Sequence, residues 1–458
     1  MELLRESVHL SLQDTKRHLR FPFTCPEGVS ELLIDWRFSP LMAGELKTLV
    51  TLSLTGPGGF KGAGHRHGDH HQVQLGAVQT TPGYLPGPVP AGEWTVTLHT
   101  HLVVDVTEGE LSVVALAGVP NQLLAEPIRP EPPNPAPVPP QDAWMLGDLH
   151  CHTQHSDGRW TPSELAAAAA KRGLSFLALT DHNTLSGRAE LARYFPGLTL
   201  PGLELTTYYG HATVVGTPEY LDWTGLEPGQ GMRELAEDVN CQGAQLTIAH
   251  PFAAGDPVCT GCAWTTFDLR PESTTHLEVW NGPWAGRHNE RALQCWYGLL
   301  ASGRRVVATA GTDAHGPAYL AGSGFTCTPM TDDPEVLLGQ LRAGMTYLCS
   351  MARLELAFLA PDGPVPLGSE GQAGLWEVSL AWTDLPAGSA LTFVVDRERY
   401  PETLGTEGSL TRRFEVLQWL NLELRSAEGD LLALTNPGYA RQGHGNSLSE
   451  NFRRRTAP

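Results

Sequence analysis

Residues 161–182 read TPSELAAAAAKRGLSFLALTDH, and the order of these residues predicts a helix followed by a buried strand. Thr161 and Glu164 have the spacing of a capping box at the start of the helix, and Gly173 is suited to end it. The apolar run 176–179 then predicts a strand, which polar and charged residues follow at once. This stretch therefore indicates one α/β unit.

The same order of strand and helix recurs further along the chain. Apolar strand patterns appear at 245–249, 276–280 and 305–310, and residues 292–300 place their apolar side chains on one helical face. Repeated units of this kind predict an α/β fold with parallel strands, arranged either as a barrel or as an open sheet.

The flanking regions have a different pattern, in which apolar and polar residues alternate. Alternation at 34–38, 50–54 and 94–98 predicts an N-terminal β-sandwich, and alternation at 376–382 and 420–424 predicts a second one. Eight of the fourteen residues 127–140 are proline, which favours an extended linker. The predicted order is a β-sandwich at 1–126, a proline-rich linker at 127–143, the α/β part at 144–350, a C-terminal β-sandwich at 351–440 and a disordered tail at 441–458.

Composition narrows the class of protein. The 458 residues are 41% hydrophobic, which is enough for packed cores, and no apolar run is long enough to span a bilayer. The formal charge of −19 makes polymeric nucleic acid an unlikely partner, unless bound cations attract it locally. The first residues lack a secretory signal, and eight cysteines are few for this length. We therefore expect a cytoplasmic protein in which most of the thiols are reduced.

Side chains of the types that bind metals follow the predicted strands. The set comprises His150, His152, His182, Glu204, His211, His250, Asp313 and His315. The carboxyl ends of parallel strands meet at one mouth, and so many polar groups beside buried strands are costly unless they bind a cation. Imidazole and carboxylate without thiolate suit Zn, Mn or Fe.

Three further features allow two interpretations each. The run 64–71, GHRHGDHH, is either a metal-binding loop or a solvated flexible loop, and composition favours the second. Cys259 and Cys262 supply only half of a zinc site, with no second pair nearby. Trp280 and Trp284, with a third tryptophan upstream, form either an apolar wall for substrate or ordinary loop packing, and their position on both sides of an asparagine favours the wall.

Short motifs in the central region resemble those of the PHP (polymerase and histidinol phosphatase) metallohydrolases. The motifs, in chain order, are DLHCH at 148–152, HSDG at 155–158, TDHN at 180–183, GLE at 202–204, AHP at 249–251, EVWNG at 278–282 and GTDAH at 311–315. The resemblance covers about residues 144–349, and it is to the branch that includes carbaryl hydrolase and PHP phosphoesterases.

This resemblance implies a distorted (β/α)7 barrel with two or three divalent metal ions (Mn, Zn or Fe). Its implied ligand sets are His150, His152, Glu204 and Asp313 for the first ion, Glu204 and His250 for the second, and Asp157, His182 and His315 for a third. His211 is implied as a ligand or a substrate contact, and His155 as a residue behind the ligands.

Other residues near the motifs are candidates for contacting the substrate. Arg188 is either a clamp for the phosphate or part of a surface ion pair, and Asn281 and His288 either contact the substrate or protonate the leaving group, or they have ordinary loop roles.

The function that the resemblance implies is metal-dependent hydrolysis of a small phosphomonoester or phosphodiester through a metal-bridging hydroxide. One alternative is a carboxylic or carbamic ester hydrolase on the same metal centre. A second alternative is a non-catalytic binding protein, which the complete set of ligand positions disfavours.

Overall fold

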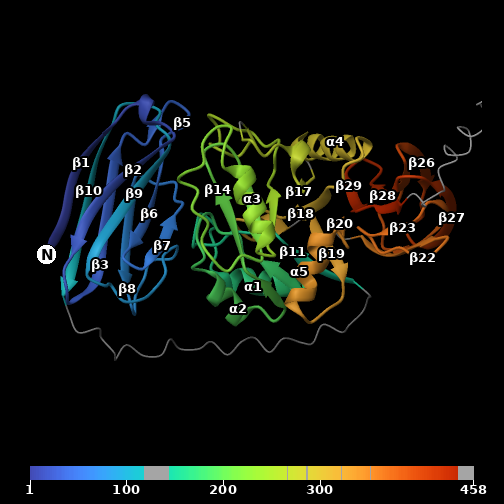
Figure 1. Ribbon diagram of the computed structural model, residues 1–458, viewed down its shortest axis with the longest axis horizontal. Helices are drawn as coiled ribbons and strands as arrows, with labels where there is room; N and C mark the ends of the chain where they lie inside the picture. The colour runs from blue at the N-terminus through green and yellow to red at the C-terminus, as the bar shows by residue number, and fades with distance from the viewer. Residues whose placement is uncertain (118–143, 266, 285–286, 321, 351, 442–458) are drawn as a thin grey trace, which may run out of the picture.

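The computed structural model describes residues 1–117, 144–265, 267–284, 287–320, 322–350 and 352–441. Figure 1 shows the N-terminal sheets at one end of an elongated molecule, the α/β part in the middle and the C-terminal sheets at the other end. The predicted linker at 127–143 and, apart from Arg441, the predicted tail lie outside the described residues. Within the described residues no helix is long and apolar enough to cross a membrane.

Two antiparallel four-stranded sheets form the N-terminal part. One has the order β1 (Glu2–Leu10), β10 (Thr107–Ala117), β3 (Val29–Ser39) and β8 (His70–Gly76). The other has the order β2 (Arg17–Cys25), β9 (Gly92–Leu102), β6 (Leu49–Gly56) and β7 (Gly59–Gly64), and a small ribbon joins β4 (Met42–Ala43) to β5 (Leu46–Lys47). Alternate residues of both sheets share one core around the fully buried Trp36 and Trp94. We call this part the N-terminal sandwich.

Helix α1 (Pro162–Arg172) begins and ends as its sequence predicts. The Thr161 side chain accepts a hydrogen bond from the backbone N–H of Glu164, whose carboxylate accepts one from the N–H of Thr161. Gly173 caps the other end with a left-handed φ of 79°. The helix leads into β12 (Phe176–Ala178), so the predicted α/β unit is confirmed.

The central strands lie in two sheets. One contains β13 (Leu198–Leu200), β12, β11 (Trp144–Asp148), β19 (Phe325–Pro329) and β20 (Tyr347–Cys349) in that order. The other has the order β14 (Gly202–Thr206), β15 (His211–Val215), β16 (Gln245–Ile248), β17 (His276–Asn281) and β18 (Val307–Gly311). The remaining helices are α2 (Arg188–Tyr194), α3 (Met232–Cys241), α4 (Arg287–Ala301) and α5 (Pro334–Ala343), with short 3-10 turns at Leu12–Asp14, Pro271–Ser273 and Pro317–Leu320.

This arrangement is a strand-rich α/β fold. The strands that the apolar pattern predicts form parallel pairs, β12 with β11 and β13, and β17 with β16 and β18, but further strands add antiparallel pairs. Strand β15 is antiparallel to both of its neighbours, and β19 is antiparallel to β11 and β20. Only residues 207–210 separate β14 from β15, which is too short for a crossover helix and therefore gives a hairpin. Within the described residues the two sheets form no closed hydrogen-bonded barrel, so the distorted (β/α)7 barrel is not confirmed.

The C-terminal strands are continuous with the central part. Strand β20 pairs with β29 (Leu431–Thr435), and the sheet continues through β28 (Trp419–Arg425), β25 (Ala390–Val395) and β26 (Glu398–Thr403), with β30 (Gly438–Arg441) and β23 (Glu370–Gln372) beside them. A second sheet has the order β22 (Gly363–Pro364), β21 (Arg353–Ala360), β24 (Gly374–Thr383) and β27 (Gly408–Val416), and the two share a core around Trp376. One ladder therefore crosses the predicted boundary at residue 350.

Candidate metal centre

The predicted ligands lie at the edge where the two central sheets meet. His150 and His152 follow β11, and His182 follows β12. Glu204 is within β14, and an isolated parallel bridge pairs it with His182. A second isolated bridge joins the loop after β11 to the loop after β18. These two bridges bring the strand ends, and the side chains on them, to one place.

Glu204 is the centre of this cluster, and its side chain is 1% exposed. Its Oε1 lies 3.1 Å from Nε2 of His250 and 3.1 Å from Nδ1 of His211. Its Oε2 lies 2.9 Å from Nδ1 of His182 and 3.4 Å from Nε2 of His152. The two carboxylate oxygens therefore face different histidines, which is the arrangement that a carboxylate needs to join two cations.

Asp313 adds a second carboxylate beside the first histidine pair. Its Oδ1 lies 3.0 Å from Nε2 of His152 and 3.5 Å from Nε2 of His150, whose Nε2 also lies 3.5 Å from Oε1 of Glu204. The structure thus brings together the four residues that the resemblance gives to the first ion.

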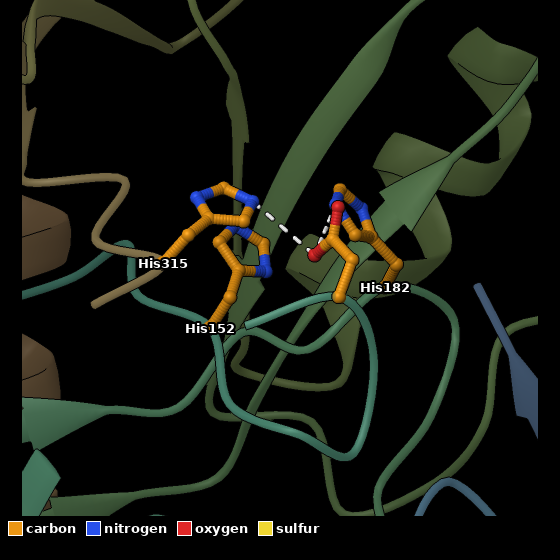
Figure 2. A group of neighbouring side chains, drawn as sticks. His152, His182 and His315 are labelled. Atoms are coloured by element: carbon orange, nitrogen blue, oxygen red, sulfur yellow. Dashed lines mark ion pairs between the residues drawn. The ribbon is translucent and has the colours of Figure 1, made fainter. Parts of the chain in front are cut away.

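Asp157 belongs to a further group with His152, His182 and His315, whose potential ligand atoms lie within 4.8 Å of one another. Its Oδ1 lies 3.5 Å from Nε2 of His182 and 3.2 Å from Nε2 of His315. Figure 2 shows the rings of His152, His182 and His315 close together, each carried by a different loop. These contacts bring together the residues that the resemblance gives to a third ion.

Two of the candidate ligands have a left-handed backbone, with φ of 27° at His250 and 50° at Asp313. Such conformations cost about 1–3 kcal/mol in a residue other than glycine and persist where neighbours enforce them. Here the N–H of His250 donates to Oε2 of Glu278 over 2.8 Å, and the N–H of Asp313 donates to the carbonyl of His150 over 2.7 Å. The fold therefore holds both side chains in place at a cost in backbone energy.

Two buried carboxylates have positioning roles that the sequence analysis did not assign. Oε1 of Glu278 lies 2.9 Å from Nδ1 of His150, which orients that ring. Asp148 accepts hydrogen bonds from the backbone N–H groups of His150 and Thr312 over 3.1 and 3.0 Å, so it ties the loop after β11 to the loop after β18. A charged residue inside an otherwise apolar strand was the available signal for both.

Several buried nitrogen and oxygen atoms of the cluster, all of which could bind a metal ion, make no hydrogen bond within the described residues. They are Nε2 of His150, both ring nitrogens of His152, Oδ1 of Asp157, Oε2 of Glu204 and Nε2 of His211. Buried polar atoms without partners are costly, and imidazole and carboxylate together are the ligands of Zn, Mn and Fe sites. These residues therefore fit a cluster of divalent metal ions.

The electrostatics of the cluster match that assignment. Burial alone raises the pKa of Glu204, but the charges of His182, His150 and His211 outweigh burial and hold this pKa well below its ordinary value. Burial lowers the pKa of His150, and Glu278 with the neighbouring carboxylates raises it well above its ordinary value. Cations entering the cluster therefore displace protons from its histidines.

The family model of the PHP domain matches residues 148–248. This segment is a PHP domain. The match confirms the family that the sequence motifs indicate, and it covers His150, His152, Asp157 and His182, which follow strands, and Glu204 within β14.

Two proteins similar to the PHP domain are a phosphatase and a ribonuclease. A 3',5'-nucleoside bisphosphate phosphatase of Chromobacterium violaceum is 36% identical over 140 residues, which are 28% of this chain and 47% of that protein. A 5'-3' exoribonuclease of Haemophilus influenzae is 44% identical over 63 residues, which are 13% of this chain and 23% of that protein. The chain thus spans less than half the length of both relatives.

A solved structure also matches the chain at low similarity. It is the crystal structure of a two-domain protein from Bacteroides vulgatus that contains a predicted PHP-like metal-dependent phosphoesterase. The match has a TM-score of 0.37 and 17% identity, and it covers 64% of this chain and 95% of that chain.

The other predicted site residues are divided between the cluster and its surroundings. Asn281 reaches the cluster, because its Nδ2 donates to Oε2 of Glu278 over 3.1 Å and to Oδ2 of Asp313 over 3.4 Å. Nδ1 of His155 lies 2.8 Å from Oγ of Ser186, so its ring contacts a neighbouring loop behind the ligands.

Arg188 and His288 make no hydrogen bond or ion pair with the cluster in the part of the chain that the structure describes. Arg188 donates instead to the carbonyls of Gly202 and Pro218 over 3.1 and 3.3 Å, and it forms no surface ion pair there either. His288 is half-buried in the first turn of α4. A substrate role for either residue stays a prediction.

One expectation for the region between His250 and Glu278 and just beyond it is wrong. Cys259 and Cys262 form a disulfide and the other six cysteines are free, so most thiols are reduced, but the tryptophans do not lie as expected. Trp280 is fully buried and Trp284 is 8% exposed, and both pack in the core beneath α4, so they form no wall for substrate. Both rings pack against apolar side chains of the neighbouring strands and of α4.

The stability of the metal-free protein should include a pH-dependent contribution from His315. Burial lowers the pKa of His315, but the carboxylate of Asp157, 3.2 Å from its Nε2, outweighs burial and raises it to about 9. Since the unfolded pKa is about 6.5, the added stability is complete below that pH and is lost as pH rises through about 9. We expect His315→Gln to lower the urea midpoint of chelator-treated protein at about pH 6 and to leave it unchanged near pH 10; an equal effect at both values contradicts this assignment.

A methyl group at Gly311 should displace a ligand. A Cβ there would lie 2.3 Å from Cβ of His150 and 3.0 Å from Oε1 of Glu278, whereas a Cβ at Gly316 would meet nothing within 4 Å. We expect Gly311→Ala to weaken binding of Mn²⁺ or Zn²⁺ by about 10- to 100-fold, as loss of ligand orientation does, and Gly316→Ala to leave it unchanged. Calorimetric titration measures both; equal affinities would show that His150 is no ligand.

Proposed function

We propose that this chain is a metal-dependent phosphoesterase that hydrolyses a small phosphomonoester or phosphodiester. The observation that carries the proposal is the convergence of histidines on the two oxygens of the buried Glu204. Several ring nitrogens and carboxylate oxygens of this cluster make no hydrogen bond within the described residues and could bind metal ions. The chain is a metal-dependent hydrolase of the PHP family. Phosphate esters as substrates are supported by the similarity to the bisphosphate phosphatase.

We propose the same three ligand sets that the resemblance to the PHP family implies. His150, His152, Glu204 and Asp313 hold the first ion, Glu204 and His250 the second, and Asp157, His182 and His315 a third. Contacts of 3.0–3.5 Å between the rings and carboxylates within these sets support this division, and a contact of 2.9 Å joins His182 to Glu204 across it. Mn, Zn and Fe all suit the donors.

Cations bound in these sets would lower the pKa of water and neutralise the oxygens of the ester. The protein's own groups fix the geometry around them. Glu278 orients the ring of His150 and fixes the backbone of His250, so the ligands need no rearrangement when substrate enters. Asn281 donates its two amide N–H groups to Glu278 and Asp313 and so holds the two carboxylates together, and a direct contact with the substrate would replace one of these hydrogen bonds. His211 holds Nδ1 toward Glu204 and keeps Nε2 for a cation or the substrate.

A substrate panel tests the proposal. Protein loaded with Mn²⁺ or Zn²⁺ is assayed on p-nitrophenyl phosphate, bis-p-nitrophenyl phosphate, a nucleoside 3',5'-bisphosphate and naphthyl esters, before and after chelation. We expect turnover of phosphate esters that chelation abolishes. Turnover of the naphthyl esters alone would establish the carboxylic ester alternative, and absence of turnover with less than one metal per chain would establish a binding protein.

Nucleic acid belongs in the same panel. The expectation that it is no partner rested on net charge, and the exoribonuclease relative does not support it. A short 5'-phosphorylated oligoribonucleotide therefore serves as an additional substrate. The proposed location is the cytoplasm, as the sequence analysis predicts.

A further inference from the structure

The N-terminal sandwich reaches the metal centre through the loop after β7. His65 and His67 lie on this loop, within the run whose composition favoured a flexible, solvated segment. The structure contradicts that interpretation for His65, which is 8% exposed. Its ring centroid lies 4.5 Å from that of His182, although the two residues are far apart in the sequence. The loop is therefore packed against the PHP domain.

The two loop histidines and Asp157 have the geometry of a cation site. Nε2 of His67 lies 3.3 Å from Oδ2 of Asp157, and one potential ligand atom from each of the three residues lies within 4.8 Å of the others. The ring contacts of His65 are to His67, His101 and His182. Two imidazoles and one carboxylate oxygen therefore lie close enough together to share one cation.

The carboxylate of Asp157 is divided between two sets of histidines. Its Oδ1 faces Nε2 of His182 and Nε2 of His315, whereas its Oδ2 faces His67. This arrangement repeats that of Glu204, whose two oxygens also face different histidines. A carboxylate placed in this way can join one cation on the PHP side to another on the sandwich side.

The N-terminal sandwich packs closely against the central part, and this packing fixes the positions of His65 and His67 relative to Asp157. Gly83 donates its N–H to Oγ of Ser186 over 3.0 Å and accepts a hydrogen bond from Oγ1 of Thr184 over 2.6 Å. A Cβ at Gly83 would lie 2.5 Å from the carbonyl of Ala63 and 2.8 Å from that of His155, so only glycine fits between the two parts. Tyr208 and Tyr220 of the central part also contact the sandwich, through a 2.6 Å hydrogen bond to a backbone carbonyl and a stacked ring.

We propose that His65, His67 and Asp157 hold a divalent transition-metal ion at the junction of the N-terminal sandwich and the PHP domain. The ligands are two imidazoles and one carboxylate oxygen, a set that suits Zn²⁺ and similar ions and leaves positions open for water or substrate oxygens. The sandwich is then a part of the metal centre. This inference deepens the proposed function, since it adds a cation beside the one assigned to Asp157, His182 and His315.

Metal content tests the proposal without reference to turnover. Chelator-treated full-length protein is reloaded with Zn²⁺, dialysed and analysed by mass spectrometry, and its affinity is measured by calorimetry. The variants are His65→Gln/His67→Gln, the single variant His67→Gln and the control His70→Gln. His70 is on the same run of sequence but is exposed, with Nε2 2.9 Å from Asp35 and no contact with Asp157.

We expect wild type and His70→Gln to hold one Zn²⁺ per chain more than the double variant, and His67→Gln to bind that ion at least about 10-fold more weakly. The side chain of His67 is 51% exposed, so the single variant decides the matter if the double variant does not fold. Equal content and affinity in wild type and His67→Gln would overturn the proposal. In that case a loss of Zn²⁺ in Glu204→Ala would preserve the proposed function, whereas wild type without bound Zn²⁺ would overturn both.

Discussion

Replacing Glu204 by alanine should abolish loading of the metal centre and lower turnover of a phosphate ester by about 10³-fold or more. The reason is that one carboxylate faces His152 and His182 through one oxygen and His211 and His250 through the other. Its removal leaves each group of histidines without its shared negative charge. Metal content after dialysis and the initial rate on the best substrate of the panel measure the two effects.

The matched control is Glu237→Ala, which removes an exposed glutamate from the surface of α3. It should leave metal content and rate unchanged. Because an alanine at 204 also removes charge from a buried cluster, the fold of both variants is checked by circular dichroism. A folded Glu204→Ala protein with full metal content or unaltered turnover would refute the central role of this residue.

Replacing Trp376 by alanine should destabilise the protein by about 3–5 kcal/mol, the usual cost of emptying a buried aromatic site. Trp376 is fully buried in the core between the C-terminal sheets, and its Nε1 donates to the carbonyl of Gln372 over 2.8 Å. Strand β29 of the same region pairs with β20, so we expect the loss to shift the unfolding of the PHP domain as well. Urea denaturation followed by circular dichroism and by release of bound metal measures both effects.

Leu375 provides the control for this prediction. It precedes Trp376 on the same strand but is 56% exposed, so Leu375→Ala should change the unfolding free energy by less than about 0.5 kcal/mol. If Trp376→Ala unfolds the C-terminal sheets while metal remains bound at the wild-type urea midpoint, the continuous sheet does not couple the two parts.

Features that depend on neighbouring residues were predictable from the sequence. The capping box at Thr161 and the glycine that ends α1 are local, and the structure contains both. The grouping of His150, Glu204 and Asp313 was also predictable, because ligand-type residues beyond buried strands converge wherever strand ends meet. These predictions needed only spacing and the apolar pattern.

Features that depend on docking were not predictable in this way. His65 is buried only because the N-terminal sandwich packs against the loops that carry His182 and Asp157, and composition alone describes its loop as solvated. The antiparallel β15 follows from a four-residue connection that the apolar pattern does not distinguish from a crossover. Trp280 looked available for substrate because its partners in the core beneath α4 are remote in sequence.

Anomalous diffraction from crystals soaked in Mn²⁺ or Zn²⁺ tests most directly whether these side chains hold metal ions. Difference peaks are predicted within bonding distance of Glu204, with a further peak among Asp157, His182 and His315. Maps that show fully loaded crystals with no peak beside either oxygen of Glu204 would contradict the assignment of this cluster as a metal centre.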